Sequence, residues 1–246
     1  MKITPRQIVI AGALSAISIV LGVTKIGFIP FVLGTSITIM HVPVIIGAIL
    51  EGPWVGTAIG LIFGVFSLIW AYIGPNGPGD IYFQNPLISI LPRLFIGLFA
   101  YLVYRSLRKI NVPWTLFLAG FGSGIWAIFC YQIGKVNIEA AILIAGIAIG
   151  SILALTYSAL KRETEITAIT LSAIVGSLTN TILVLGMMGL LGATNWVPAI
   201  PWGVLLGIGL TNGIPEALGA VLLTVAVITT WKQIEFGRKG ARIFRD

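Results

Sequence analysis

The sequence has 246 residues, of which 57% are apolar and only 9% are charged, and its formal net charge at pH 7 is +7. A soluble domain carries about a quarter charged residues, so this composition excludes a soluble enzyme, a nucleic-acid-binding protein and a disordered chain. The apolar runs are long and continuous, which predicts an all-α integral membrane protein. With one cysteine and one histidine, neither an internal disulfide nor a Cys or His metal cluster is expected.

Eight apolar segments are long enough to cross a membrane as helices, since a crossing takes about 20 residues. In chain order they are residues 7–24, 30–50, 54–73, 86–104, 113–133, 138–160, 166–191 and 203–230. Only Glu51-Gly52-Pro53 separates the second from the third, and residues 28–36 are alternatively a surface loop. We therefore expect one transmembrane domain over residues 1–246, with a basic tail at 232–246.

The basic residues orient this arrangement. With the N-terminus inside, twelve of them lie at the inner ends of the spans and only Lys25 and Lys135 at the outer ends, a strong positive-inside bias. This predicts that both termini are cytoplasmic. The residues assigned to the inner ends are Lys2, Arg6, Arg105, Arg108, Lys109, Lys161, Arg162, Lys232, Arg238, Lys239, Arg242 and Arg245.

Ionisable side chains inside a span are costly, about 2.5–3.5 kcal/mol at the helix centre, and each needs a reason. Arg93 follows Pro86 by seven residues, which places it about 10 Å below the outer surface. It either reaches that surface, pairs with Glu216, or binds a carboxylate. His41 precedes Pro43, which loosens the helix, so His41 is either a packing residue or part of a polar cavity.

The most polar segment of any predicted span is residues 211–216, where Asn212 and Glu216 share one helix face. A second polar cluster lies in span 166–191. Such residues either join helices to one another or line a pocket, and both interpretations stay open. The second cluster consists of Ser177, Thr179, Asn180 and Thr181.

Two further patterns concern the surface of the spans. Small residues in the first span would let another helix approach closely, within this chain or from a partner. Aromatic residues flank the outer edge, where an interfacial belt accounts for most of them and one or two could stack on a ligand. The small residues are Ala11, Gly12, Ser15 and Ala16, and the aromatic residues are Trp70, Tyr72, Tyr82, Phe83, Trp196 and Trp202.

Several of these segments together resemble a known family. Residues 34–53, which contain Met40-His41-Val42-Pro43, are similar to the second helix and turn of the S components of energy-coupling factor (ECF) vitamin transporters. Residues 176–186 and 212–217 resemble their fifth and sixth helices, and the first span fits their first helix. The motif around His41 is closest to the pantothenate-type branch. S components usually have six helices, so the surplus at about 110–165 is an inserted two-helix hairpin between core helices at 1–109 and 166–231.

The resemblance implies a function. An S component captures a vitamin or related small nutrient from outside the cell, without a cofactor. It delivers the nutrient inwards after docking on a membrane scaffold subunit that carries two ATPase subunits. The implied substrate-binding residues are His41, Arg93, Thr179, Asn180, Asn212 and Glu216, and the implied docking residues are Ala11, Gly12, Ser15 and Ala16. A pantothenate-like substrate suits a buried arginine, and the implied location is a prokaryotic plasma membrane.

Three other classes of protein are weighed against this expectation. A membrane-embedded enzyme would need a catalytic set, and the chain has one histidine and only two aspartates, Asp80 and Asp246. A solitary ion-gradient-driven permease would show broken helices at matching positions of two repeats, and only the span around Pro215 is clearly broken. A structural scaffold would not need Arg93 and Glu216 buried. The permease is the main alternative.

Overall fold

The structure is a computed structural model that describes residues 3–30, 36–75, 77–108 and 164–243. Five apolar helical segments in these ranges are long enough to cross a membrane: α1 (Pro5–Val23), α3 (Pro53–Ile73), the α4–α5 segment (Pro86–Leu107), α8 (Thr164–Ala193) and α9 (Trp202–Ile243). They confirm five of the eight predicted spans as apolar helices. The predicted spans 113–133 and 138–160 lie outside the described residues.

The predicted span 30–50 is wrong. In its place a two-stranded antiparallel hairpin, β1 (Phe28–Pro30) and β2 (Ser36–Thr38), precedes a short helix, α2 (Val42–Glu51). Ten helical residues span only about 15 Å, half of the hydrocarbon thickness. Every residue from Val42 to Ile49 is buried. The apolar character of α2 therefore reflects burial inside the protein, because this helix is too short to cross the membrane.

Local sequence signals explain where these helices begin and end. α1 begins with a capping box, in which Thr4 Oγ1 accepts from the Gln7 backbone N–H and Gln7 Oε1 accepts from the Thr4 backbone N–H. Gly52 lies at φ +98°, a conformation that favours glycine, and so separates α2 from α3 without a loop. The observed turn between α2 and α3 is at Glu51-Gly52-Pro53, the position predicted from the sequence.

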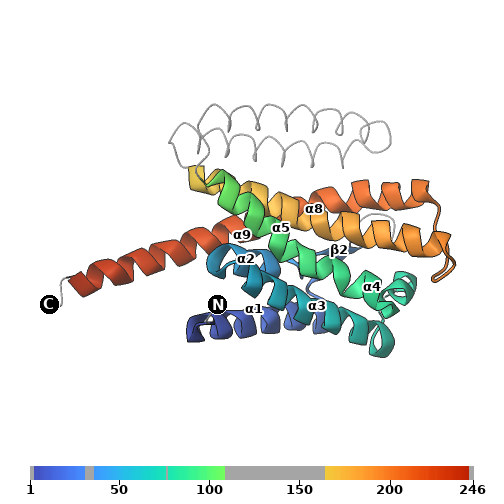
Figure 1. Cartoon of the computed structure of the whole chain (residues 1–246), viewed down its shortest axis with the longest axis horizontal. Coiled ribbons are helices and arrows are strands. Elements are labelled where there is room, and N and C mark those ends of the chain that lie inside the picture. Colours follow the sequence, from blue (N-terminus) through green and yellow to red (C-terminus); the bar gives the residue numbers. More distant parts are fainter. Residues whose placement is uncertain (1–2, 31–35, 76, 109–163, 244–246) are drawn as a thin grey trace. The chain divides into compact units, whose positions relative to one another are not determined.

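The chain divides into two compact units, one of residues 1–102 and 172–246 and the other of residues 103–171. In the first unit α1, α2 and α3 pack against one another, and α9 contacts both α2 and β2 (Figure 1). Arg6 of α1 forms ion pairs with Glu51 at 2.6 Å and with Glu235 of α9 at 3.3 Å. One end of this unit thus holds the start of α1, the α2–α3 turn and the distal part of α9.

Of the second unit, only residues 103–108 and 164–171 are described. Within it, the Tyr104 hydroxyl donates to Glu165 Oε1 at 2.7 Å and joins the end of α5 to the start of α8. The remaining residues of the predicted inserted hairpin lie outside the described ranges.

Candidate functional site

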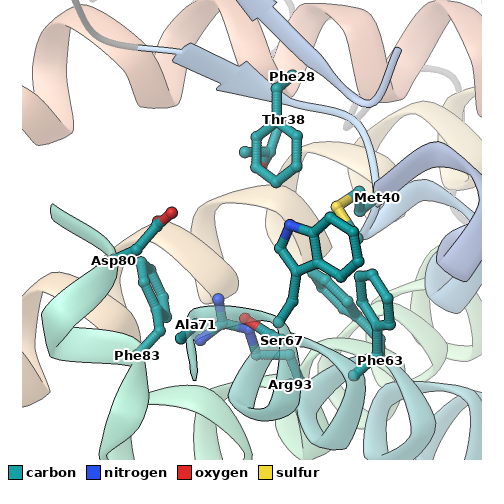
Figure 2. A pocket seen from close by; sticks show the side chains of 11 residues that line it. Phe28, Thr38, Met40, Phe63, Ser67, Ala71, Asp80, Phe83 and Arg93 are labelled. Atoms are coloured by element: carbon teal, nitrogen blue, oxygen red, sulfur yellow. The ribbon is translucent and has the colours of Figure 1, made fainter. Parts of the chain in front are cut away.

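A cavity of about 90 Å³ opens between the β1–β2 hairpin, α3, the short helix η2 (Pro78–Gln84) and α5 (Leu91–Leu107). It has room for several water molecules or for part of a small organic ligand. Figure 2 shows Thr38 and Phe28 on one side of the cavity, Met40 and Phe63 on another, and Arg93 with Ser67 and Ala71 opposite the hairpin. The remaining lining residues are Phe66, Trp70, Asp80 and Phe83.

Arg93 is buried at the start of α5, where the α4–α5 segment is broken. Pro92 has no N–H to give to the carbonyl of Ile88, four residues earlier, and Arg93 Nη1 donates to that carbonyl instead. The guanidinium lies 5.4 Å from the ring centroid of Phe63 and 4.9 Å from that of Phe83. Two aromatic faces and one carbonyl therefore stabilise the cation away from water.

Part of the guanidinium is left without a partner. Arg93 Nε is buried and has no hydrogen-bond acceptor among the described residues. Arg93 and Glu216 are close enough to interact electrostatically but do not form an ion pair. The structure thus places Arg93, buried, at the wall of a cavity. It shows no direct ion pair with Glu216, which was one of the three interpretations of Arg93.

A row of glycines on α3 places Arg93 at this wall. A Cβ on Gly56 would lie 3.0 Å from the Cα of Gly97, and a Cβ on Gly60 would overlap the carbonyl of Arg93 itself. One turn further, a Cβ on Gly64 would lie 2.8 Å from the Ser89 carbonyl oxygen. Glycine at every fourth residue lets the two helix backbones approach closely, as in other membrane helix pairs.

Trp70, on the same helix, contributes a second polar atom to the cavity. Its ring stacks on Phe66 with centroids 5.5 Å apart, and its other edge lies over Gly74, where a Cβ would come within 2.9 Å of the indole. The indole Nε1 is buried and finds no acceptor within the described part of the chain. A stacked neighbour on one side and a glycine on the other hold this ring in place.

Glu216 fixes the hairpin side of the cavity. Its Oε1 accepts from the backbone N–H of Thr38 at 2.8 Å and from the Thr38 hydroxyl at 3.2 Å, and its Oε2 accepts from the Thr181 hydroxyl at 3.3 Å. Glu216 thereby joins β2, α8 and α9, although it does not line the cavity. A buried carboxyl group that accepts several hydrogen bonds is a stable arrangement inside a protein.

The other predicted binding residues lie away from the cavity lining. His41 is fully buried before α2, and both of its ring nitrogens lack partners in the described ranges. Asn180 is buried with Oδ1 unpaired, whereas Thr179 donates to Val175 in its own helix at 2.7 Å. Asn212 is half-buried and accepts from Thr211 at 3.5 Å. Of the six residues, only Arg93 lines the cavity.

The predicted docking residues of α1 do not all face the same way. Gly12 and Ala16 are exposed and Ala11 is half-buried, and a Cβ on Gly12 would meet nothing within 4 Å. Ser15, in contrast, is buried. An exposed surface of small residues on α1 therefore centres on Gly12 and Ala16.

Sequence reasoning missed most of the aromatic lining. Phe28, Phe63 and Phe66 sit in apolar runs where nothing local distinguishes a cavity wall from a lipid-facing position. Trp70 and Phe83 were placed mainly in an interfacial belt, and both instead line the cavity. The available signal was the alternative that one or two of these aromatic residues stack on a ligand.

The groups that line the cavity can form hydrogen bonds and apolar contacts with a small molecule. No group of three or more His, Cys, Asp or Glu side chains that could hold a metal ion occurs in the described part of the chain. The cavity offers cationic and indole N–H donors, aromatic faces, two hydroxyls and the carboxylate of Asp80 (Figure 2). These groups suit a small ligand with an apolar body and a few polar groups.

Two comparisons with known proteins bear on the site. Residues 6–138, just over half of the chain, match the family model of the substrate-specific component of ECF transporters. The pantothenate transporter PanT of Leuconostoc mesenteroides subsp. mesenteroides is 33% identical over 107 residues, which are 42% of this chain and 52% of that protein. The chain thus spans about half the length of this curated relative. The matched family region includes every residue that lines the cavity.

Proposed function

The chain belongs to the ECF transporter substrate-specific component family, and from this premise we propose that it captures a vitamin or related small nutrient for import. A substrate-specific component binds its substrate and performs no chemistry on it, so we infer that the chain is not an enzyme. The cavity beside Arg93 is the proposed binding site. His41, Thr179, Asn180, Asn212 and Glu216 remain proposed members of the polar surroundings.

We propose that the substrate is pantothenate or a similar small carboxylate. One support is the relative from Leuconostoc mesenteroides, which is a pantothenate transporter. The other is the cavity, where a buried guanidinium keeps Nε without an acceptor among the described residues. This guanidinium, whose Nε is unpaired at an aromatic wall, is the observation that carries the proposal, because a guanidinium forms strong hydrogen bonds with a carboxylate.

The proposed assembly follows from the family. We propose that the chain sits in a prokaryotic plasma membrane with both termini cytoplasmic, and that a scaffold subunit with two ATPase subunits drives uptake. The exposed Gly12 and Ala16 of α1 are the proposed docking surface. The alternative, a solitary permease driven by an ion gradient, would transport substrate without these partners.

The test begins with the purified protein in detergent. Native mass spectrometry will detect a small molecule that co-purifies with the chain, and titration with pantothenate will give its affinity. We expect Arg93→Ala to weaken pantothenate binding by about 30-fold or more, because truncating one partner of a buried charged contact costs about 2 kcal/mol or more. The variant should remain folded by circular dichroism and size-exclusion chromatography.

The matched control is Arg105→Ala, which removes an exposed arginine from the same helix and should leave the affinity unchanged. Equal affinities for Arg93→Ala and the wild type would remove Arg93 from the site. A wild-type protein that arrives empty and does not bind pantothenate would contradict the proposed substrate. Uptake into vesicles by the chain alone would favour the permease.

A further inference from the structure

We propose that Trp70 determines substrate specificity, because its indole N–H and the guanidinium of Arg93 together bind the anionic head group of the substrate. This inference rests on the proposed function and names a second binding residue in the same cavity. Both residues line the cavity, and both have a buried nitrogen, Trp70 Nε1 and Arg93 Nε, that is unpaired among the described residues.

The chemistry of the two unpaired atoms specifies the kind of group that they can bind. An indole nitrogen and a guanidinium nitrogen only donate hydrogen bonds, so the partner must be an acceptor. A buried donor without a partner costs about 1–3 kcal/mol, which is relieved when an acceptor enters the cavity. A carboxylate has about four acceptor positions on two oxygens and is therefore able to accept from two donors.

The indole is held in position before any substrate arrives. Phe66 stacks on one part of the ring at 5.5 Å, and Gly74 leaves room for the opposite edge. Arg93 is held in the same way by Phe63, Phe83 and the Ile88 carbonyl. Positioned donors do not lose conformational freedom on binding, so more of their hydrogen-bond energy contributes to affinity.

The other residues that line the cavity indicate the chemistry of the remaining part of the substrate. Phenylalanine rings and Met40 offer an apolar wall to its body, while Thr38, Ser67 and Asp80 offer acceptors for hydroxyl or amide hydrogens. Asp80 Oδ2 already accepts from the Gly77 N–H at 3.3 Å, which fixes this carboxylate on η2. The substrate class is therefore a small carboxylate with an apolar body and hydrogen-bond donors on a part remote from the carboxylate.

The test compares Trp70→Phe with the wild type, using pantothenate and pantothenol as probes in calorimetric titrations of the full-length protein. Pantothenol carries a hydroxymethyl group in place of the carboxylate. Trp70→Phe keeps an aromatic ring but removes the N–H donor together with one ring of the indole, and the comparison of two probes separates the lost donor from the lost volume. We expect it to weaken pantothenate binding by about tenfold or more and pantothenol binding by clearly less, because a hydrogen bond to a charged group is about twice as strong as a neutral one.

Gly74→Ala gives a second, independent variant, because its methyl group displaces the indole while every hydrogen-bonding group is retained; it should show the same selective loss. Trp196→Phe changes an exposed tryptophan and should leave both affinities unchanged. Equal loss for the two probes, or no loss for either, would overturn the role of Trp70 while leaving the proposed function intact. A wild-type protein that binds neither probe would contradict the proposed substrate and this inference together.

Discussion

Arg93 and Glu216 show two ways in which this chain accommodates an ionisable side chain inside a membrane helix. Arg93 lies against two aromatic rings and donates to a carbonyl that Pro92 leaves without its usual partner. Glu216 accepts three hydrogen bonds from Thr38 and Thr181. The difference matters for function: the partners of Glu216 are all within the protein, whereas Arg93 keeps one donor directed at no described group.

We expect Glu216→Gln to lower the stability of the protein and to weaken substrate binding. The amide nitrogen of glutamine cannot accept a hydrogen bond, so the Thr181 hydroxyl loses Glu216 as an acceptor and keeps only the Ser177 carbonyl, at 3.4 Å. The loss of one hydrogen bond costs about 0.5–1.5 kcal/mol. Thr38 also lines the cavity, so a loosened hairpin changes the shape of the site. Thermal unfolding in detergent and pantothenate titration will measure the two effects.

Thr211→Ala is the control for this variant, because the exposed Thr211 hydroxyl bonds carbonyls of its own helix, with Gly207 at 2.9 Å. It should melt like the wild type. A Glu216→Gln protein with an unchanged melting temperature would show that the contacts of Glu216 with the hairpin contribute nothing to stability.

At the scale of elements, the pairing of α3 with the α4–α5 segment places the cavity wall. Gly56, Gly60 and Gly64 all face that segment, and Gly60 meets the backbone of Arg93. We expect Gly60→Ala to destabilise the protein by about 1–3 kcal/mol, because a methyl group there must push the two helices apart. The same displacement moves Arg93 and should weaken substrate binding, as measured by thermal unfolding and titration.

Gly207→Ala is the matched control on α9, since a Cβ at Gly207 meets nothing within 4 Å. It should be neutral or slightly stabilising, because alanine is the better helix former. If Gly60→Ala also behaves in this way, the close approach of α3 and α5 at Arg93 is not required for the fold.

The elements also show what sequence reasoning could predict. Hydropathy located α1, α3, the α4–α5 segment, α8 and α9, because a run of about 20 apolar residues has few other uses. It failed in the first part of the predicted span 30–50, because a residue such as Ile37 is as apolar in a hairpin as in a span. Hydropathy reports that a residue avoids water, and it does not distinguish burial by lipid from burial by protein.

The site was harder to predict for the same reason. Arg93 was identified because a charge in an apolar run has a clear cost. Trp70 was only one of six aromatic residues that could stack on a ligand, since its position at the cavity depends on the hairpin and η2, which are brought together with α3 only by the tertiary structure. The contact between Glu216 and Thr38 joins residues separated by 178 positions and has no local signature.

At the scale of the whole molecule, α1 is the least buried of the five candidate spans in the described part of the chain. Only 17% of the residues in the apolar window of α1 are buried, compared with 39–44% in the other candidate spans. Gly12 and Ala16 lie on its exposed surface, and Arg6 at its start ties it to Glu51 and Glu235. A helix that packs on α2 and α3 with one face and leaves small residues exposed on another suits the proposed docking on a scaffold subunit.

This arrangement predicts that binding and uptake can be separated by one substitution. Gly12→Leu adds a large side chain where nothing lies within 4 Å, so the fold and the cavity should be unaffected. A bulky residue among small ones prevents the close helix approach that such surfaces allow. We therefore expect unchanged pantothenate affinity in detergent and loss of uptake in cells that produce the complete energising module. Gly207→Leu, an equally open position on α9, should retain uptake. Uptake by Gly12→Leu at the wild-type rate would show that this surface of α1 is not where the partner docks.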